Sequence, residues 1–133
     1  MNDLLQQYEK FVDGVTSKPS KRGDEFVHRL KDLDCECNIA RLMTAALGMP
    51  DEAGEFTGLV KKIVFHGKPL NDENRALLEK ELGDVIWYWM QACMALELNP
   101  EDVILKNIKK LESRYPGGVF SVERSEVREE GDV

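Results

Sequence analysis

The segment from residue 79 to residue 96, EKELGDVIWYWMQACMAL, constrains the fold more than any other part of the chain. From Leu82 to Leu96 it is apolar on almost every face of a helix, so it must be covered on several sides. Two carboxylates, Glu81 and Asp84, nevertheless stand at the entrance to this apolar run. Burial of an unpaired charge is costly, so the two acids need a partner, and a bound cation would supply one.

Helical periodicity recurs along the rest of the chain, and no segment shows the alternation that is typical of a strand. We therefore predict an all-α protein, a helical bundle of about four to five helices that forms one domain over residues 1–133. The expected helices cover residues 3–15, from about residue 24 through the segment NIARLMTAAL with a pause near residue 33, 51–65, about 73–97, and 100 to about 115.

Turn residues separate these helices. Residues 16–24 and 66–72 contain glycine and proline and are expected to be loops. Pro50 predicts a break or a kink, because proline removes a helix hydrogen bond. Asn99 followed by Pro100 is a strong helix start signal. The polar residues from about 118 to 133 are expected to form an irregular tail.

The charge balance restricts the partners. A net charge of −7 over 133 residues disfavours binding to a nucleic-acid polymer. No apolar run reaches the length of a membrane span, and the first ten residues lack the basic and apolar regions of a signal peptide. We therefore expect a cytoplasmic protein without a membrane partner. The three cysteines do not form a disulfide framework and are interpreted as reduced, structural residues.

Two pairs of acids share a helical spacing. Glu52 and Glu55 are three residues apart and lie on one helix face, and Glu81 and Asp84 repeat this spacing. One such pair alone is usually solvated surface, but both pairs border apolar stripes. If the two helices pack side by side, the four carboxylates meet, and hard cations such as Mg²⁺ prefer these oxygen ligands.

Candidate substrate contacts lie near the acids or on the last helix. Lys62 and His66 fall on the same side of their helix as the acids, and Tyr88 shares the Glu81 stripe. Asn107, Lys110 and Arg114 form one stripe of the last helix. The simpler interpretations remain open: a surface position for His66, a core or interface role for Tyr88, and a solvated helix end for the last two cations.

The chain resembles the all-α nucleoside triphosphate pyrophosphohydrolases of the MazG type, in particular the short single-domain forms of phages and bacteria. The resemblance covers about residues 39–121 and is carried by AALGMPDEAGEF, VKKIVFHGKPL, ELGDVIWYW and NIKKLESRYPGGVF. It implies Mg²⁺-dependent hydrolysis of nucleoside or deoxynucleoside triphosphates to the monophosphate and pyrophosphate, with Mn²⁺ as a substitute, in a homo-oligomer that is a dimer or a tetramer.

The resemblance also assigns roles to residues. Glu52, Glu55, Glu81 and Asp84 correspond to the metal ligands, and Glu55 is a candidate for the base that holds the attacking water. Lys110 and Arg114 correspond to the triphosphate-binding residues, with Asn107 nearby, and the family's VKK and FHG stretches contain Lys62 and His66. The base and sugar that the enzyme prefers are not assigned.

Two other functions compete with this one. A di-iron carboxylate bundle needs an ExxH motif on each of two helices, and the chain has one match, Glu25 to His28. A non-catalytic module that binds a nucleotide or an alarmone could use the same helical scaffold. Iron in the purified protein would favour the first alternative, and absence of metal-dependent turnover would favour the second.

Overall fold

The computed structural model describes residues 3–127, and over this range the chain is helical with no strand. This confirms the all-α class. Seven α-helices occur among the described residues, against the four to five expected, partly because two of them are only four and five residues long. The helices are α1 (Asp3–Val15), α2 (Lys18–Lys21), α3 (Gly23–Asp34), α4 (Ile39–Phe65), α5 (Asp72–Ala95), α6 (Pro100–Arg114) and α7 (Val122–Glu126), with a 3₁₀ turn at Pro116–Gly118.

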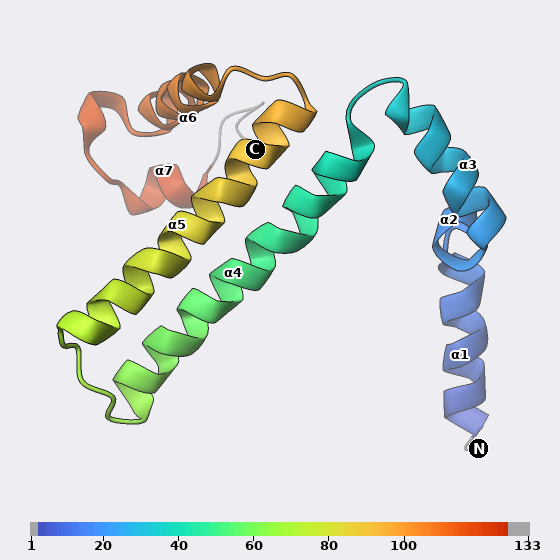
Figure 1. Ribbon diagram of the computed structural model, residues 1–133, viewed down its shortest axis with the longest axis horizontal. Coiled ribbons are helices and arrows are strands. Elements are labelled where there is room, and N and C mark those ends of the chain that lie inside the picture. The colour runs from blue at the N-terminus through green and yellow to red at the C-terminus, as the bar shows by residue number, and fades with distance from the viewer. Residues whose placement is uncertain (1–2, 128–133) are drawn as a thin grey trace.

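The centre of the molecule is an antiparallel hairpin of the two longest helices, α4 and α5 (Figure 1). The arm formed by α1, α2 and α3 lies beyond the α4 side, and α6 with α7 leaves from the C-terminal end of α5 (Figure 1). Among the described residues, no helix has both the length and the apolar character needed to cross a membrane.

The loop between α4 and α5 is held by backbone and side-chain hydrogen bonds. Gly67 adopts a left-handed conformation with φ of 70°, which a glycine tolerates without strain. Asn71 caps α5 by accepting a hydrogen bond from the amide of Asn74 at 2.9 Å. The side chain of Asn74 is buried and donates to the carbonyl of Pro69 at 2.6 Å. These contacts set the register of the hairpin.

The opposite end of the hairpin is also closed. The amide of Asn38, the N-cap of α4, donates to the carbonyl of Ala95 at 3.1 Å. In the stretch between the two ends, Gly48 faces Tyr88 and Glu55 faces Glu81, which is the pairing expected of one constant antiparallel register. The hairpin is therefore a fixed scaffold for side chains that point between its helices.

Helix α4 continues through Pro50, so the break considered for residues 48–51 does not occur. Proline has no amide hydrogen, and the carbonyl of Ala46 consequently lacks its helical partner. Packing against α5 compensates in this region. Gly48 is buried, and the ring of Tyr88 lies directly against its backbone, where any side chain would collide with the ring.

Replacement of Gly48 by alanine is expected to destabilise the hairpin by about 1–3 kcal/mol, because the added methyl group must displace the Tyr88 ring. Gly58→Ala is the matched control, since Gly58 lies in the same helix and an added methyl group meets nothing within 4 Å. That control is expected to gain up to about 1 kcal/mol from helix propensity. Thermal melts of both variants test this, and equal effects would contradict it.

The C-terminal region differs from the irregular tail that the sequence predicted. Residues 122–126 form α7, and its N-cap Ser121 accepts a hydrogen bond from the amide of Arg124 at 3.4 Å. The ring of Tyr115 packs on that of Phe120 at 5.5 Å between centroids. The remainder of the expected tail, residues 128–133, lies outside the described residues.

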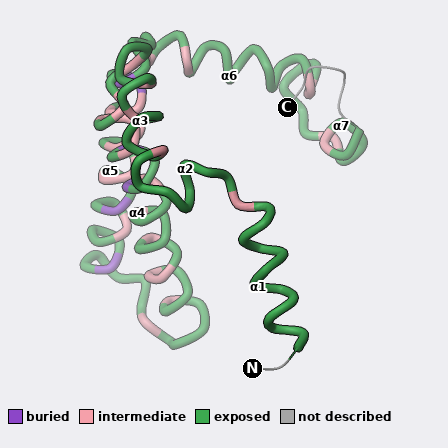
Figure 2. Tube along the Cα trace, turned by 90° about the vertical axis from the view of Figure 1, so that its right-hand side faces the viewer, coloured by how far each residue is buried: buried purple, intermediate pink, exposed green. Residues whose placement is uncertain are grey.

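The single chain has almost no hydrophobic core. In the part of the chain that the structure describes, the buried apolar residues are Ala45, Cys93 and Ala95, and most of the tube in Figure 2 is exposed. The chain exposes 10692 Å², whereas a compact monomer of this length exposes roughly 7,100 Å². The excess of about 3,600 Å² includes large apolar side chains on every long helix, a pattern typical of subunits that bury surface by association.

Candidate metal and nucleotide site

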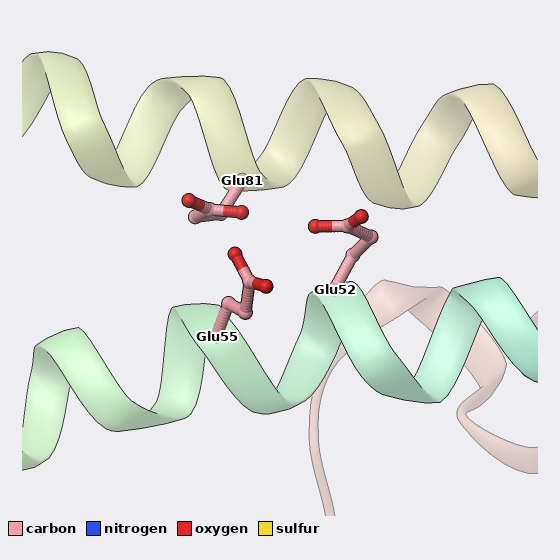
Figure 3. A group of neighbouring side chains, drawn as sticks. All are labelled: Glu52, Glu55 and Glu81. Atoms are coloured by element: carbon pink, nitrogen blue, oxygen red, sulfur yellow. The ribbon is translucent and has the colours of Figure 1, made fainter.

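Three glutamates converge between the two helices of the hairpin. Glu52 and Glu55 reach from successive turns of α4, and Glu81 reaches toward them from α5 (Figure 3). One carboxylate oxygen from each residue lies within 4.8 Å of the other two. The spacing of three residues places the α4 pair on one face, and the hairpin register places Glu81 opposite them.

Glu81 is the most buried member of this cluster, with 8% of its surface exposed. Its Oε2 atom is buried and has no hydrogen-bond partner among the described residues. An unpartnered carboxylate oxygen at this depth is unfavourable unless a ligand satisfies it. The donors are all carboxylate oxygens, so the site fits a hard divalent cation such as Mg²⁺.

The pKa values of two glutamates show the mutual repulsion. The pKa of Glu52 is raised first by desolvation between the helices and then by the negative charges of Glu55, Glu81 and Asp84. The pKa of Glu55 is raised mainly by the charge of Glu81, while Lys80 acts in the opposite direction. Both shifts have the sign expected for carboxylates that lie close together between two helices.

Acidification is therefore expected to stabilise the metal-free protein through these two residues. Because their folded-state pKa values exceed the unfolded value of about 4.3, the folded state takes up protons first as the pH falls. The stabilisation grows as the pH falls through the raised values and is lost as it rises through them. Thermal melts in EDTA across a pH series, compared with a Glu52→Gln, Glu55→Gln double variant, isolate this contribution.

Saturating Mg²⁺ should cancel that contribution, because the cation binds the ionised carboxylates and competes with protons. Equal pH dependence of the melting temperature in wild type and double variant, both without metal, would contradict the prediction.

Asp84 lies one turn from Glu81 on α5 and is half-buried. It is not among the three residues whose ligand atoms converge, although its charge contributes to the raised pKa of Glu52. The structure thus brings three of the four predicted metal ligands together and places the fourth beside them.

The other candidates on the hairpin lie in different surroundings. The Tyr88 ring packs against Gly48 of α4 and meets the Trp87 ring edge-on at 4.9 Å, and its contact with substrate stays a prediction. Lys62 and His66 are exposed at the loop end of α4, two and three turns beyond Glu55. Their assignment to the substrate stays a prediction.

The candidates on α6 are not gathered at the glutamates within one chain. Asn107 lines an apolar groove with Trp89 and Met49, next to the first half of α6. Lys110 and Arg114 belong to the second half of α6, which extends away from the hairpin (Figure 2). Their role as phosphate ligands also stays a prediction.

Two residues that position the site had no role in the sequence interpretation. Gly48 allows Tyr88 to approach α4, and Asn74 ties the start of α5 to the loop. A glycine within a helix two residues before a proline is a weak signal of close packing, and an asparagine three residues after an N-cap gives no signal at all. The roles of both residues can be recognised only once the pairing of α4 with α5 is known.

Comparisons with known proteins match the part of the chain that contains these residues. The model of the MazG nucleotide pyrophosphohydrolase domain matches residues 42–119, which include all three converging glutamates and Asp84. The chain is also similar to the Gene 37 protein of Mycobacterium phage L5, with 39% identity over 88 residues that cover 65% of this chain and 76% of that protein. No solved structure matches the chain significantly.

Proposed function

Because this chain belongs to the MazG nucleotide pyrophosphohydrolase family, we propose that it hydrolyses nucleoside or deoxynucleoside triphosphates to the monophosphate and pyrophosphate, with Mg²⁺ as cofactor. The converging glutamates, with a buried and unpartnered oxygen on Glu81, are the observation that carries this proposal. We place the activity in a single domain over residues 1–133, in the cytoplasm, with Mn²⁺ able to replace Mg²⁺.

The residues divide the chemical work according to their exposure. Glu52, Glu55 and Glu81, with Asp84 beside them, would hold the metal. When bound, Mg²⁺ neutralises phosphate charge and lowers the pKa of a coordinated water. Glu81 is buried, whereas Glu55 is exposed and has a raised pKa, so Glu55 is suited to orient the attacking water and accept its proton.

The phosphate ligands require a second copy of the chain. Phosphoryl transfer depends on positioning and charge neutralisation, so a triphosphate needs cations opposite the acids. Since the second half of α6 leaves its own hairpin, Lys110 and Arg114 would reach the glutamates of a partner. Asn107, Tyr88, Lys62 and His66 complete the proposed substrate contacts, and the assembly is a dimer or a tetramer.

Substitutions on α6 test whether Lys110 and Arg114 bind phosphate or are only solvated charges at the end of a helix. We expect Arg114→Lys to lower kcat/KM by a factor that corresponds to about 1–3 kcal/mol of lost transition-state stabilisation, because lysine keeps the charge but loses the planar hydrogen-bonding fork. Lys110→Ala should likewise raise KM while Mg²⁺ binding to the free enzyme is retained. Lys106→Ala, on the same helix, is the control. Steady-state kinetics with parallel melts distinguish the two roles. An unchanged kcat/KM in both variants would show that Lys110 and Arg114 do not bind the phosphates.

The products identify the reaction. Purified protein is incubated with Mg²⁺ and a panel of nucleoside triphosphates, and pyrophosphate and orthophosphate are measured separately. The proposal predicts one pyrophosphate and one monophosphate for each substrate consumed. Release of orthophosphate with the diphosphate would overturn it, and binding without metal-dependent turnover would support a non-catalytic nucleotide- or alarmone-binding module instead.

The di-iron alternative receives less support from the structure. Glu25 and His28 lie on α3, outside the hairpin, and the converging group found among residues 3–127 contains no histidine. Di-iron sites of this class use glutamate and histidine from four facing helices. The three-glutamate site fits a hard cation better.

A further inference from the structure

Helix α1 carries an apolar face that is exposed and that no other helix among residues 3–127 covers. It runs apart from the α4–α5 hairpin in both views (Figures 1 and 2). An isolated helix of 13 residues is marginal in water, so a solvated α1 would gain little from its own backbone bonds. Between 41% and 68% of the surface is exposed at each apolar residue of this face: Leu4, Leu5, Tyr8, Phe11, Val12 and Val15.

The elbow after α1 keeps this face away from the rest of the same chain. The Nζ atom of Lys21 lies 3.2 Å from Oδ2 of Asp13 and donates to the Asp13 carbonyl at 2.8 Å. These contacts hold the end of α1 against α2, and α1 and α3 then leave α2 in opposite directions (Figure 1). Helix α1 therefore cannot lie along its own α3.

A groove of matching character lies between α2, α3 and the start of α4. Its rim is cationic, with Lys21, Arg22 and Arg29, and Arg29 has no ion-pair partner among the described residues. Its floor is apolar and is formed by Phe26, Leu30, Leu33, Ile39 and Met43.

We propose that α1 of a second copy occupies this groove, so that two chains exchange their N-terminal helices reciprocally. Of the three acids of α1, Asp13 is paired with Lys21 of its own chain, which leaves Asp3 and Glu9 to complement the cationic lining of the groove, above all Arg29. Its 13 residues span about 20 Å, close to the roughly 18 Å of the 12-residue α3 that forms one wall. Glu9 borders the apolar face and is the acid best placed to meet the rim.

The alternative partners fit less well. Pairing of α1 with α1 would cover the apolar faces but would bring two acidic helices together, which is unfavourable. The area also favours an interface beyond the hairpin, because the excess of about 3,600 Å² per chain is several times the roughly 800 Å² that a standard interface buries on each partner. A reciprocal exchange is a closed, two-fold arrangement and does not lead to fibres.

Hydrogen–deuterium exchange of the full chain tests the proposal. Docking should slow amide exchange in residues 3–15 by roughly tenfold or more relative to a variant in which docking is lost. Phe11→Glu should abolish protection of its own α1 and also of α3, which contacts the partner's α1. Arg29→Glu reverses a rim charge without altering the floor and should weaken protection of α1. Lys10→Glu, on the polar face, is the control and should leave α3 protected.

Complementation in trans shows whether the exchange is between chains. A Phe11→Glu chain keeps an intact groove, and a Leu30→Glu chain keeps an intact α1. Mixing the two variants should restore protection to the α1 of the Leu30→Glu chain, because it docks into the Phe11→Glu groove. No restoration on mixing, full protection of α1 in the unmixed Leu30→Glu protein, or fast exchange of α1 in wild type would each overturn the proposal.

Discussion

Replacing Glu81 by glutamine is expected to reduce kcat/KM by roughly 10²–10³-fold or more while the chain remains folded. Glutamine keeps the shape of the side chain but removes the charge that would hold the metal, and loss of one preorganised electrostatic contact typically has this magnitude. Glu81 should show the largest effect because it is the most buried of the three converging glutamates and its Oε2 atom has no hydrogen-bond partner among the described residues.

The alanine variants of all four acids, Glu52, Glu55, Glu81 and Asp84, are each expected to lose most of the activity. Removal of Glu52 or Glu55 also removes a carboxylate with a raised pKa, so the metal-free melting temperature should rise in those two variants. Loss of activity with a gain in metal-free stability is the signature of a binding site, because a purely structural acid would lose stability when removed.

Glu79→Gln provides the matched control for these substitutions. Glu79 is an exposed acid on the same helix, two residues before Glu81, and it is not part of the converging group. Kinetics at several Mg²⁺ concentrations, metal titrations and melts in EDTA complete the experiment. Near wild-type turnover of a variant at saturating Mg²⁺ would show that the substituted residue is not part of the metal site.

Introducing a charge on the outer face of α5 is expected to dissociate the protein into monomers and to lower its melting temperature severely. Ile86 is 65% exposed in the single chain and belongs to a stripe on α5 with Leu82, Met90 and Met94. If this stripe is the centre of a subunit interface, Ile86→Glu would bury an unpaired carboxylate there, at a cost of several kcal/mol. The single chain has little core to sustain its fold alone, because the buried apolar residues found between residues 3 and 127 are three small ones.

The Ile86→Glu variant should also lose activity when it dissociates, because the proposed phosphate ligands come from the partner. Arg75→Glu makes a charge change of the same sign at the start of the same helix and should leave the mass unchanged. Light scattering and native mass spectrometry measure the mass of the assembly. The melting temperature and the turnover are then measured on the same samples. A stable wild-type monomer at micromolar concentration, or an Ile86→Glu protein that assembles normally, would contradict the prediction.

The sequence by itself determined the local features of this protein. Asn99 accepts a hydrogen bond from the amide of Glu101 at 2.9 Å, as predicted for the N-cap that starts α6. Helix α1 covers the predicted residues 3–15, and the spacing of Glu52 and Glu55 places both on one face of α4. Such features depend on residues within about one helical turn of each other, so their signals are complete in a short segment.

Only the tertiary structure decided the features that involve two helices. Continuation of α4 through Pro50 occurs where Gly48 packs against Tyr88. The hairpin register, rather than the motif spacing, makes Glu81 the buried member of the cluster and leaves Asp84 beside it. Periodicity states which face of a helix a residue occupies, but not which residue of another helix it meets, because that depends on packing between distant segments.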